Sequence, residues 1–276
     1  MAEIHASAIV DPRARIGRDV SIGAYSIIGP DVTIEDDTAI GHHVVVEGPV
    51  VLGAGMQIGH GAVIGGVPQD LKFRKDTFSG VRIGPRTVLR EYVTVNRATT
   101  PDAWTSIGSD GFFLTASHVG HDCRVGDGVI VINGAAIAGH CDVADRATVG
   151  AYAGLHPFTR VGTHAYIGGL AKVTSDVPPY MIVDGNPATA RSVNIIGLRR
   201  AGMVPAERRA LQDAYRLLYR SGIAPAAAVA RMRAELEPSA AVARLVEFIT
   251  ASKRGICGPP RRADVEAAVS ESGGVV

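Results

Sequence analysis

The chain has 276 residues and a formal net charge of +1, with 28 lysines and arginines against 27 acidic residues. Such a balance argues against a nucleic-acid-binding protein or a membrane-surface protein, because both need concentrated positive charge. Glycine is abundant (33 residues) and aromatic residues make up only 5%, which suits turns and stacked aliphatic side chains. No signal-peptide pattern or membrane-spanning apolar stretch is present, so we expect a soluble cytoplasmic protein without an integral membrane segment.

An apolar residue recurs at every sixth position in two long runs. The first run extends from Val10 to Ile64 and the second from Ile107 to Val173, and a small or apolar residue mostly stands two positions before each. A helix would show apolar spacings of three and four, and a plain strand a spacing of two. A period of six therefore predicts short strands that turn at fixed intervals, which is the pattern of a hexapeptide-repeat β-helix.

The repeat also predicts which residues lie above one another. Three hexads close a triangular coil of eighteen residues, so residues eighteen apart should be separated by about one strand spacing, ~4.8 Å. Known prisms with this repeat wind left-handed, against the general right-handed rule for crossover connections. We therefore expect a mainly β protein, a left-handed parallel β-helix with flat outer faces that favour a symmetric oligomer.

Two segments interrupt the repeat. Residues 66–80 and residues 96–106 carry no hexad, and both are predicted to form loops that leave the prism. Long loops in so regular a scaffold are usually functional.

The repeat ends near Pro178 and Pro179, since proline cannot continue a strand ladder. A helical pattern begins at about residue 192, and Pro205 stands where the first turn of a second helix is expected. Further helices are predicted over about 225–236 and 238–251. We expect a β-helix domain over residues 1–190, a small α-helical C-terminal domain over 191–254, and a disordered tail over 255–276.

The three cysteines do not suggest disulfides or catalysis. Cys123, Cys141 and Cys257 form neither a CxxC motif nor an even framework. Cys123 and Cys141 both occupy the inward position two residues before an apolar rung, so we expect them to pack rather than to act as nucleophiles.

The residues with the most chemical character are His118–Val119–Gly120–His121–Asp122–Cys123. By the eighteen-residue register, His140 should lie next to Asp122, and Gly139 next to His121. This arrangement would place two imidazoles, a carboxylate and a backbone N–H on one outward patch. A histidine with an ordinary pKa of ~6.5 can accept a proton near pH 7, so His121 is a candidate general base.

Together with motifs elsewhere in the chain, these residues resemble those of a known family, the UDP-N-acetylglucosamine O-acyltransferases, which catalyse the first step of lipid A synthesis. The resemblance covers residues 1 to about 255. It is carried by HVGHDC (118–123), QDLK in the first loop (69–72), DVPPY (176–180), GN (185–186) and AYRLLYRSG (214–222).

The resemblance implies a reaction and a role for each matching residue. An (R)-3-hydroxyacyl chain would pass from acyl carrier protein to the sugar 3-hydroxyl, in a homotrimer with no metal or other cofactor. His121 would be the general base, Asp122 would orient it, and the N–H of Gly139 would bind the oxyanion. The substrate-binding residues implied are Asp70, Lys72, His118, His140, His156, Gly169, Asn194 and Arg200. Of these, Asp70 and Lys72 would reach a neighbouring subunit's site, Gly169 would limit acyl length, and Asn194 and Arg200 would meet the uridine diphosphate.

The sequence departs from the family pattern at four positions. Pro157 stands where glutamine is common, and Pro187 where histidine occurs. Ile196 and Ala201 replace an acidic and a basic nucleotide contact. Acyl-chain length, 3-hydroxylation and the choice between a hydroxyl and a 3-amino acceptor therefore stay open.

Other classes of function also stay open from the residues alone. An acetyl-coenzyme A-dependent sugar acetyltransferase shares the repeat. A zinc enzyme of the γ-carbonic anhydrase kind would use three histidines, for which His118, His121 and His140 are candidates. A non-catalytic β-helix scaffold would make the histidines a polar wall only.

Overall fold

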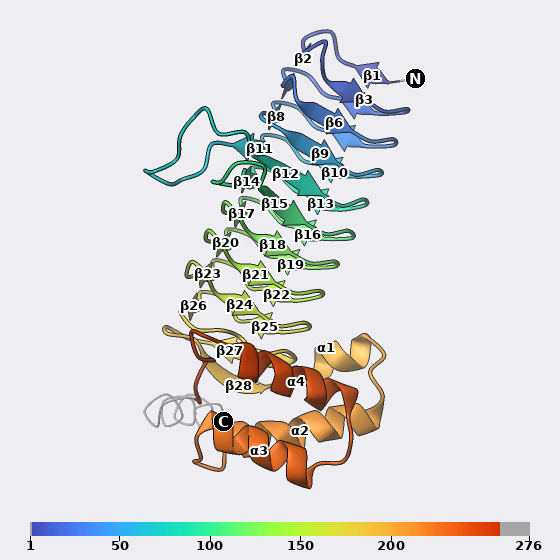
Figure 1. Ribbon diagram of the computed structural model, residues 1–276. Coiled ribbons are helices and arrows are strands. Elements are labelled where there is room, and N and C mark those ends of the chain that lie inside the picture. Colours follow the sequence, from blue (N-terminus) through green and yellow to red (C-terminus); the bar gives the residue numbers. More distant parts are fainter. Residues whose placement is uncertain (1, 260–276) are drawn as a thin grey trace, which may run out of the picture.

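The computed structural model describes residues 2–259 and consists of a three-walled prism that ends on a group of helices (Figure 1). The coils of the prism wind left-handed, and their strands pair in parallel from one coil to the next. The prediction of a left-handed parallel β-helix is therefore confirmed. No helix within residues 2–259 is long and apolar enough to cross a membrane.

Each wall is one sheet of short strands. The first wall contains β1 (Glu3–Ile4), β4 (Ser21–Ile22), β7 (Ala39–Ile40), β10 (Gln57–Ile58), β13 (Val88–Leu89), β16 (Phe112–Phe113), β19 (Ile130–Val131), β22 (Thr148–Val149), β25 (Tyr166–Ile167), β27 (Met181–Asp184) and β28 (Thr189–Val193). The second wall contains β2 (Ile9–Val10), β5 (Ile27–Ile28), β8 (Val45–Val46), β11 (Val63–Gly66), β14 (Thr94–Asn96), β17 (His118–Val119), β20 (Ala136–Ile137), β23 (Gly154–Leu155) and β26 (Lys172–Val173). The third wall contains β3 (Arg15–Ile16), β6 (Val32–Ile34), β9 (Val50–Leu52), β12 (Gly80–Ile83), β15 (Trp104–Ile107), β18 (Arg124–Val125), β21 (Asp142–Val143) and β24 (Arg160–Val161).

The register between coils is eighteen residues wherever the repeat is unbroken. Ser21 pairs with Ala39, and His118 pairs with Ala136. The step is longer where β9 pairs with β12 and where β12 pairs with β15, because residues 67–79 and 97–103 leave the prism between these strands. Both predicted loops are thus present. The first extends well away from the prism (Figure 1).

The core is the column of rung residues inside the prism. Phe113, Val131, Ile137 and Val149 are fully buried, and the inward cysteines Cys123 and Cys141 are buried with them. Outward neighbours on the same strands are exposed or half-buried. This alternation follows the two-residue period of a strand and explains why a six-residue repeat is visible in the sequence.

The helices follow the predicted pattern closely. They are α1 (Ile195–Arg200), α2 (Pro205–Tyr219), α3 (Pro225–Glu235) and α4 (Ala240–Ala251). Proline stands at the start of α2 and α3, where its missing N–H costs nothing, and the side chain of Ser239 caps α4. The boundary expected at residue 190 falls inside β28, because this strand pairs with β27 and continues the first wall to Val193.

The beginning of the expected tail is ordered, contrary to its assignment as disordered from residue 255. The N–H of Asp176 donates to the carbonyl of Gly255 at 2.9 Å, and the N–H of Cys257 donates to the carbonyl of Asp176 at 2.8 Å. Cys257 is 1% exposed. The backbone hydrogen bonds and the buried thiol hold this segment against the last coil. The rest of the predicted tail, residues 260–276, lies outside the described residues.

The two faces of a third-wall strand give a matched test of the prism core. Ile34 on β6 is 1% exposed, whereas its neighbour Thr33 points outward. We expect Ile34→Ala to lower the free energy of unfolding by about 2–5 kcal/mol, because it leaves a cavity between coils. Thr33→Ala should change it by about 0.5 kcal/mol or less. Urea unfolding followed by circular dichroism measures both, and equal effects would contradict the inward assignment.

Candidate active site

The candidate site lies on one edge of the prism, where the second wall turns into the third. We call this edge the histidine corner and define it by the successive turns 120–123, 138–141, 156–159 and 174–177. Asp122, His140 and Phe158 occupy the same place in three successive turns, and each has a positive φ of 59–65°. This left-handed backbone reverses the chain and directs their side chains outward.

His121 and Asp122 form the central pair. Nδ1 of His121 lies 2.8 Å from Oδ2 of Asp122, and both side chains are largely buried, with 14% and 12% exposed. Burial opposes ionisation of Asp122, but hydrogen bonds from His121 and Thr99 outweigh it and lower the pKa of Asp122 below its ordinary value. An ionised carboxylate can only accept, so Nδ1 of His121 carries the proton. In the neutral ring Nε2 is then free to accept another.

Thr99 fixes the carboxylate in place. Its N–H donates to Asp122 Oδ1 at 3.1 Å, and its hydroxyl donates to Oδ2 at 2.7 Å. Thr99 belongs to the second loop and had no role in the sequence prediction. The sequence indicated only that this loop is functional. It did not single out Thr99, because the path of the loop back to the histidine corner depends on packing.

Gly139 lies directly beneath the His121 ring, as the eighteen-residue register predicts. A Cβ at this position would lie 2.5 Å from Cε1 of His121, so only glycine leaves room for the imidazole. The Gly139 N–H takes no part in the backbone hydrogen bonds of the described coils. It therefore remains available beside the imidazole.

A row of rings continues along the corner. The His140 ring meets the His121 ring edge-on at 5.0 Å, and its Nε2 is 3.6 Å from Oδ2 of Asp122. On its other side His140 stacks on Phe158, with ring centres 4.5 Å apart. His156, also on this corner, is exposed, and its Nδ1 lies 3.3 Å from Nη1 of Arg254.

His118 lies on β17 beside this pair. Its Nδ1 is 2.8 Å from the hydroxyl of Thr94. Burial lowers the pKa of His118, and the nearby His121 adds to the effect. His118 is therefore held neutral, which suits a hydrogen-bonding role rather than a charged one.

The remaining predicted residues do not gather around His121 in a single chain. Asp70 and Lys72 belong to the first loop, which leaves the prism at this same edge, between β11 and β12, but extends away from it (Figure 1). The helix α1, which carries Arg200 and is capped by Asn194, lies on the opposite side in Figure 1. Gly169 lies on a different edge, where the first wall turns into the second, and a Cβ there would meet one atom within 4 Å, the carbonyl oxygen of Ala151 at 3.4 Å. One chain alone therefore does not gather all the predicted residues.

Within residues 2–259, one chain forms neither an exposed thiol nor the three-histidine zinc cluster. Cys141 and burial together raise the pKa of Cys123, and both thiols face the prism interior. Within residues 2–259, the only His, Cys, Asp or Glu group close enough to share a metal is His121, Asp122 and His140. His118 is not part of it, and the Asp122 carboxylate is already engaged by Thr99 and His121.

A β-helix with a histidine–carboxylate pair beside an available backbone N–H has the parts of a general-base acyltransferase. Residues 176–257 match the family model described as "Udp N-acetylglucosamine O-acyltransferase; Domain 2". The chain belongs to the UDP-N-acetylglucosamine O-acyltransferase family, because relatives of that name match it at 46% and 48% identity over 93% and 92% of its length.

Relatives that match most of the chain support this family assignment. The acyl-[acyl-carrier-protein]–UDP-N-acetylglucosamine O-acyltransferase of Burkholderia lata is 46% identical over 93% of this chain and 99% of its own. The enzyme of the same name from Anaeromyxobacter dehalogenans is 48% identical over 92% and 98%.

Solved structures agree in fold. The UDP-N-acetylglucosamine acyltransferase of Bacteroides fragilis superimposes with a TM-score of 0.89 at 36% identity, over 91% of this chain and 98% of that one. The Acinetobacter baumannii homologue gives 0.88 at 38% identity, over 92% and 99%.

The lowered pKa of His118 predicts a pH dependence of stability. Above its ordinary value of 6.5, the folded and unfolded chains are both neutral at this position and His118 contributes nothing. Below it the unfolded chain binds a proton that the folded chain resists, so stability falls as the pH is lowered. His118→Gln should reduce this fall, measured by urea unfolding at about pH 8 and about pH 5.5. The same pH dependence in both proteins would contradict a neutral, buried His118.

Proposed function

We propose that this enzyme transfers an (R)-3-hydroxyacyl chain from acyl carrier protein to the 3-hydroxyl of UDP-N-acetylglucosamine, the first step of lipid A biosynthesis. We propose further that it works in the cytoplasm without a metal or other cofactor. The observation that carries the proposal is the His121–Asp122 pair above the N–H of Gly139, in a chain that belongs to this family.

The chemistry is a direct transfer in which His121 handles the proton. Nε2 of His121 removes the proton of the sugar hydroxyl as its oxygen attacks the thioester carbonyl carbon. The N–H of Gly139 binds the oxyanion of the tetrahedral intermediate. When the intermediate collapses, the carbon–sulfur bond breaks and the imidazolium returns its proton to the departing thiolate. Asp122 stabilises the imidazolium meanwhile, and Thr99 holds Asp122 in line.

The substrates would extend along the corner on both sides of His121. His140 and His156 lie on this corner, His118 lies beside it on β17, and all three would serve as hydrogen-bonding groups toward the substrates. Asp70, Lys72, Asn194 and Arg200 would contact the nucleotide sugar, and the absence of a side chain at Gly169 would admit a long acyl chain.

A homotrimer with sites between subunits explains why these residues are spread over one chain. The first loop extends away from the prism (Figure 1), and its residue Leu71 is fully exposed at 107%. The turns between the first and second walls also expose large side chains in several coils. These are Tyr25, Tyr92, Tyr152 and Leu170. Exposed apolar residues in a column support a contact with another copy.

Variants at the corner test the reaction. His121→Gln should lower kcat by about 10²–10⁴, because the general base is lost. Gly139→Ala should be similarly impaired, since its Cβ would displace the imidazole. Gly154→Ala, whose Cβ would have no neighbour within 4 Å, is the matched control and should stay active.

Transfer is measured by mass spectrometry, with UDP-N-acetylglucosamine, its 3-amino analogue and a panel of acyl carrier protein thioesters. Activity should survive dialysis against a chelator. Full activity of His121→Gln, or loss of activity with the chelator, would overturn the proposal.

Mixed oligomers test the shared site. Lys72→Ala and His121→Gln should each be nearly inactive alone, and each should sediment as a trimer of 28.7 kDa chains. When the two are co-expressed, some sites pair an intact Lys72 from one subunit with an intact His121 from another. We expect about a quarter of wild-type activity or more to return. No recovery in a verified mixed trimer would contradict a site built from two subunits.

A further inference from the structure

The segment that follows α4 brings positive charge to the histidine corner at the end nearest the helices. The buried carboxylate of Asp176 accepts from the backbone N–H of Arg160 at 2.9 Å and from the hydroxyl of Ser252 at 2.7 Å. Together with the backbone pairing of Asp176, these bonds place Lys253 and Arg254 at a cavity of about 660 Å³. Its other lining residues are Phe158, Arg160, Asp176 and Ala251.

Among the described residues, the cations of this cavity form no ion pair with a carboxylate. Arg254 donates to the carbonyls of Pro157 at 2.8 Å and Thr174 at 3.1 Å, both neutral acceptors. The Arg160 guanidinium lies 4.5 Å from the centre of the Phe248 ring. Within residues 2–259 neither arginine nor Lys253 forms an ion pair. Three unpaired cations around one cavity favour an anionic ligand.

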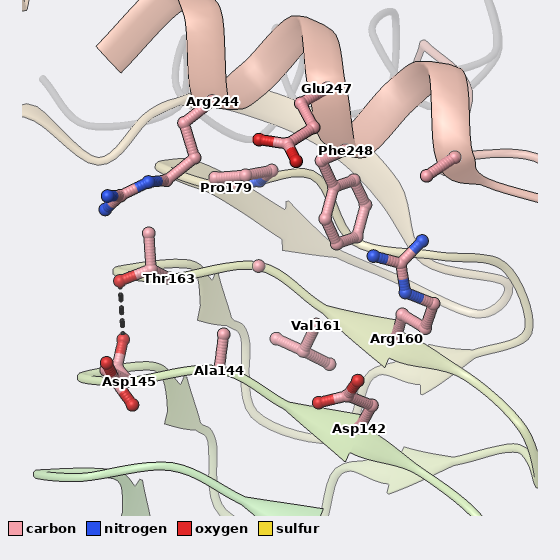
Figure 2. Close-up of a pocket in the computed structure, with 12 residues that line it drawn as sticks. Asp142, Ala144, Asp145, Arg160, Val161, Thr163, Pro179, Arg244, Glu247 and Phe248 are labelled. Carbon is pink, nitrogen blue, oxygen red and sulfur yellow. Dashed lines mark hydrogen bonds between the residues drawn. The ribbon is translucent and has the colours of Figure 1, made fainter. Parts of the chain in front are cut away.

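A neighbouring cleft is lined by carboxylates, and the comparison shows on which side of Arg160 an anion could bind. This cleft, of about 360 Å³, lies between α4 and the third wall. Figure 2 shows the carboxylates of Asp142, Asp145 and Glu247 around it, with Arg244 and Arg160 at its ends. The carboxylates would repel a phosphate there, whereas the cavity beside Arg254 contains only the engaged carboxylate of Asp176.

The distance from this cavity to His121 follows from the coil register. The turn that contains His121 follows β17. Along the second wall, the turn that contains Phe158 follows β23, two coils further, and the turn that contains Asp176 follows β26, three coils further. At ~4.8 Å per coil these separations are ~10 Å and ~14 Å, and the cavity lies between these two levels. The stacked rings of His140 and Phe158 line the path between them.

The arm of the thioester donor can span this separation. An acyl carrier protein holds its acyl chain on a phosphopantetheine arm, with a phosphodiester at the far end. From sulfur to phosphorus the extended arm is about as long as four extended residues, ~14 Å. With the thioester at His121, the phosphate of such an arm can therefore reach the cations at two to three coils' distance.

We propose that Arg254, together with Lys253 and Arg160, binds the phosphate of the donor's phosphopantetheine arm. This inference rests on the proposed function, since it assumes a carrier-bound thioester as donor. It gives the C-terminal segment a role in substrate binding, because the segment carries two of the three cations into the site.

Two small donors that differ only in the phosphate test the inference directly. The binding of an acyl-phosphopantetheine and of the corresponding acyl-pantetheine is measured by calorimetry on the full chain. Wild type should bind the phosphorylated compound about tenfold more tightly. Lys253→Gln/Arg254→Gln should lose that preference while its affinity for acyl-pantetheine is unchanged. Arg254→Lys, which keeps the charge, should retain most of the preference.

An exposed arginine elsewhere in the helical domain serves as the matched control. Arg233→Gln on α3 removes the same charge away from the cavity and should keep the wild-type preference.

Equal binding of the two compounds by wild type, or no binding of either, would overturn the inference. Equal weakening of both compounds by the double variant would mean that the segment only shapes the fold. Weaker binding of UDP-N-acetylglucosamine instead would assign the cations to the nucleotide's diphosphate. Acyl transfer by wild type from acyl carrier protein, measured separately, tells whether the proposed function itself has failed.

Discussion

The parallel pairing of each coil with the next, eighteen residues further along the chain, is the constraint on which the rest of the molecule depends. It stacks apolar rungs inside the prism and stacks turn residues outside it. The same register that buries Ile137 above Leu155 also places His121 over Gly139 and Asp122 beside His140. The core and the site therefore depend on the same register, because a shift of one residue in the pairing would misplace both the buried rungs and the turn residues.

The stiffness of this scaffold suits the chemistry that we propose for it. A general base must keep one nitrogen free and aimed, which requires the other nitrogen to be held. Asp122 holds Nδ1 of His121, and Thr99 holds Asp122 with two hydrogen bonds. His121 and Asp122 sit in a tight turn of the regular prism, between β17 and β18. The second loop supplies the last constraint, from a segment that breaks the repeat.

The helical domain is connected to the corner through Asp176. This buried carboxylate ties the end of α4 to the last coil, through Ser252 and the backbone of residues 255–257. These contacts place Arg254 so that it donates to the carbonyl of Pro157, with its Nη1 3.3 Å from Nδ1 of His156. The helical domain is therefore joined to the histidine corner by contacts outside the prism core.

The sequence by itself determined the elements that depend on local period. The six-residue repeat predicts the prism, its interruptions at both loops and the stacking of Gly139, His140, His121 and Asp122, since each follows from counting residues along one coil. Proline positions likewise predict where α2 and α3 begin.

Only the tertiary structure decided the contacts made by segments outside the repeat. The contact of Thr99 with Asp122, the return of residues 255–258 to the last coil and the unpaired cations near Phe158 depend on how non-repeating segments pack. Such segments have no period to fix their partners, and the energies that hold them come from residues far apart in the chain. The spread of the other predicted residues over opposite sides of the prism is also visible only in three dimensions (Figure 1).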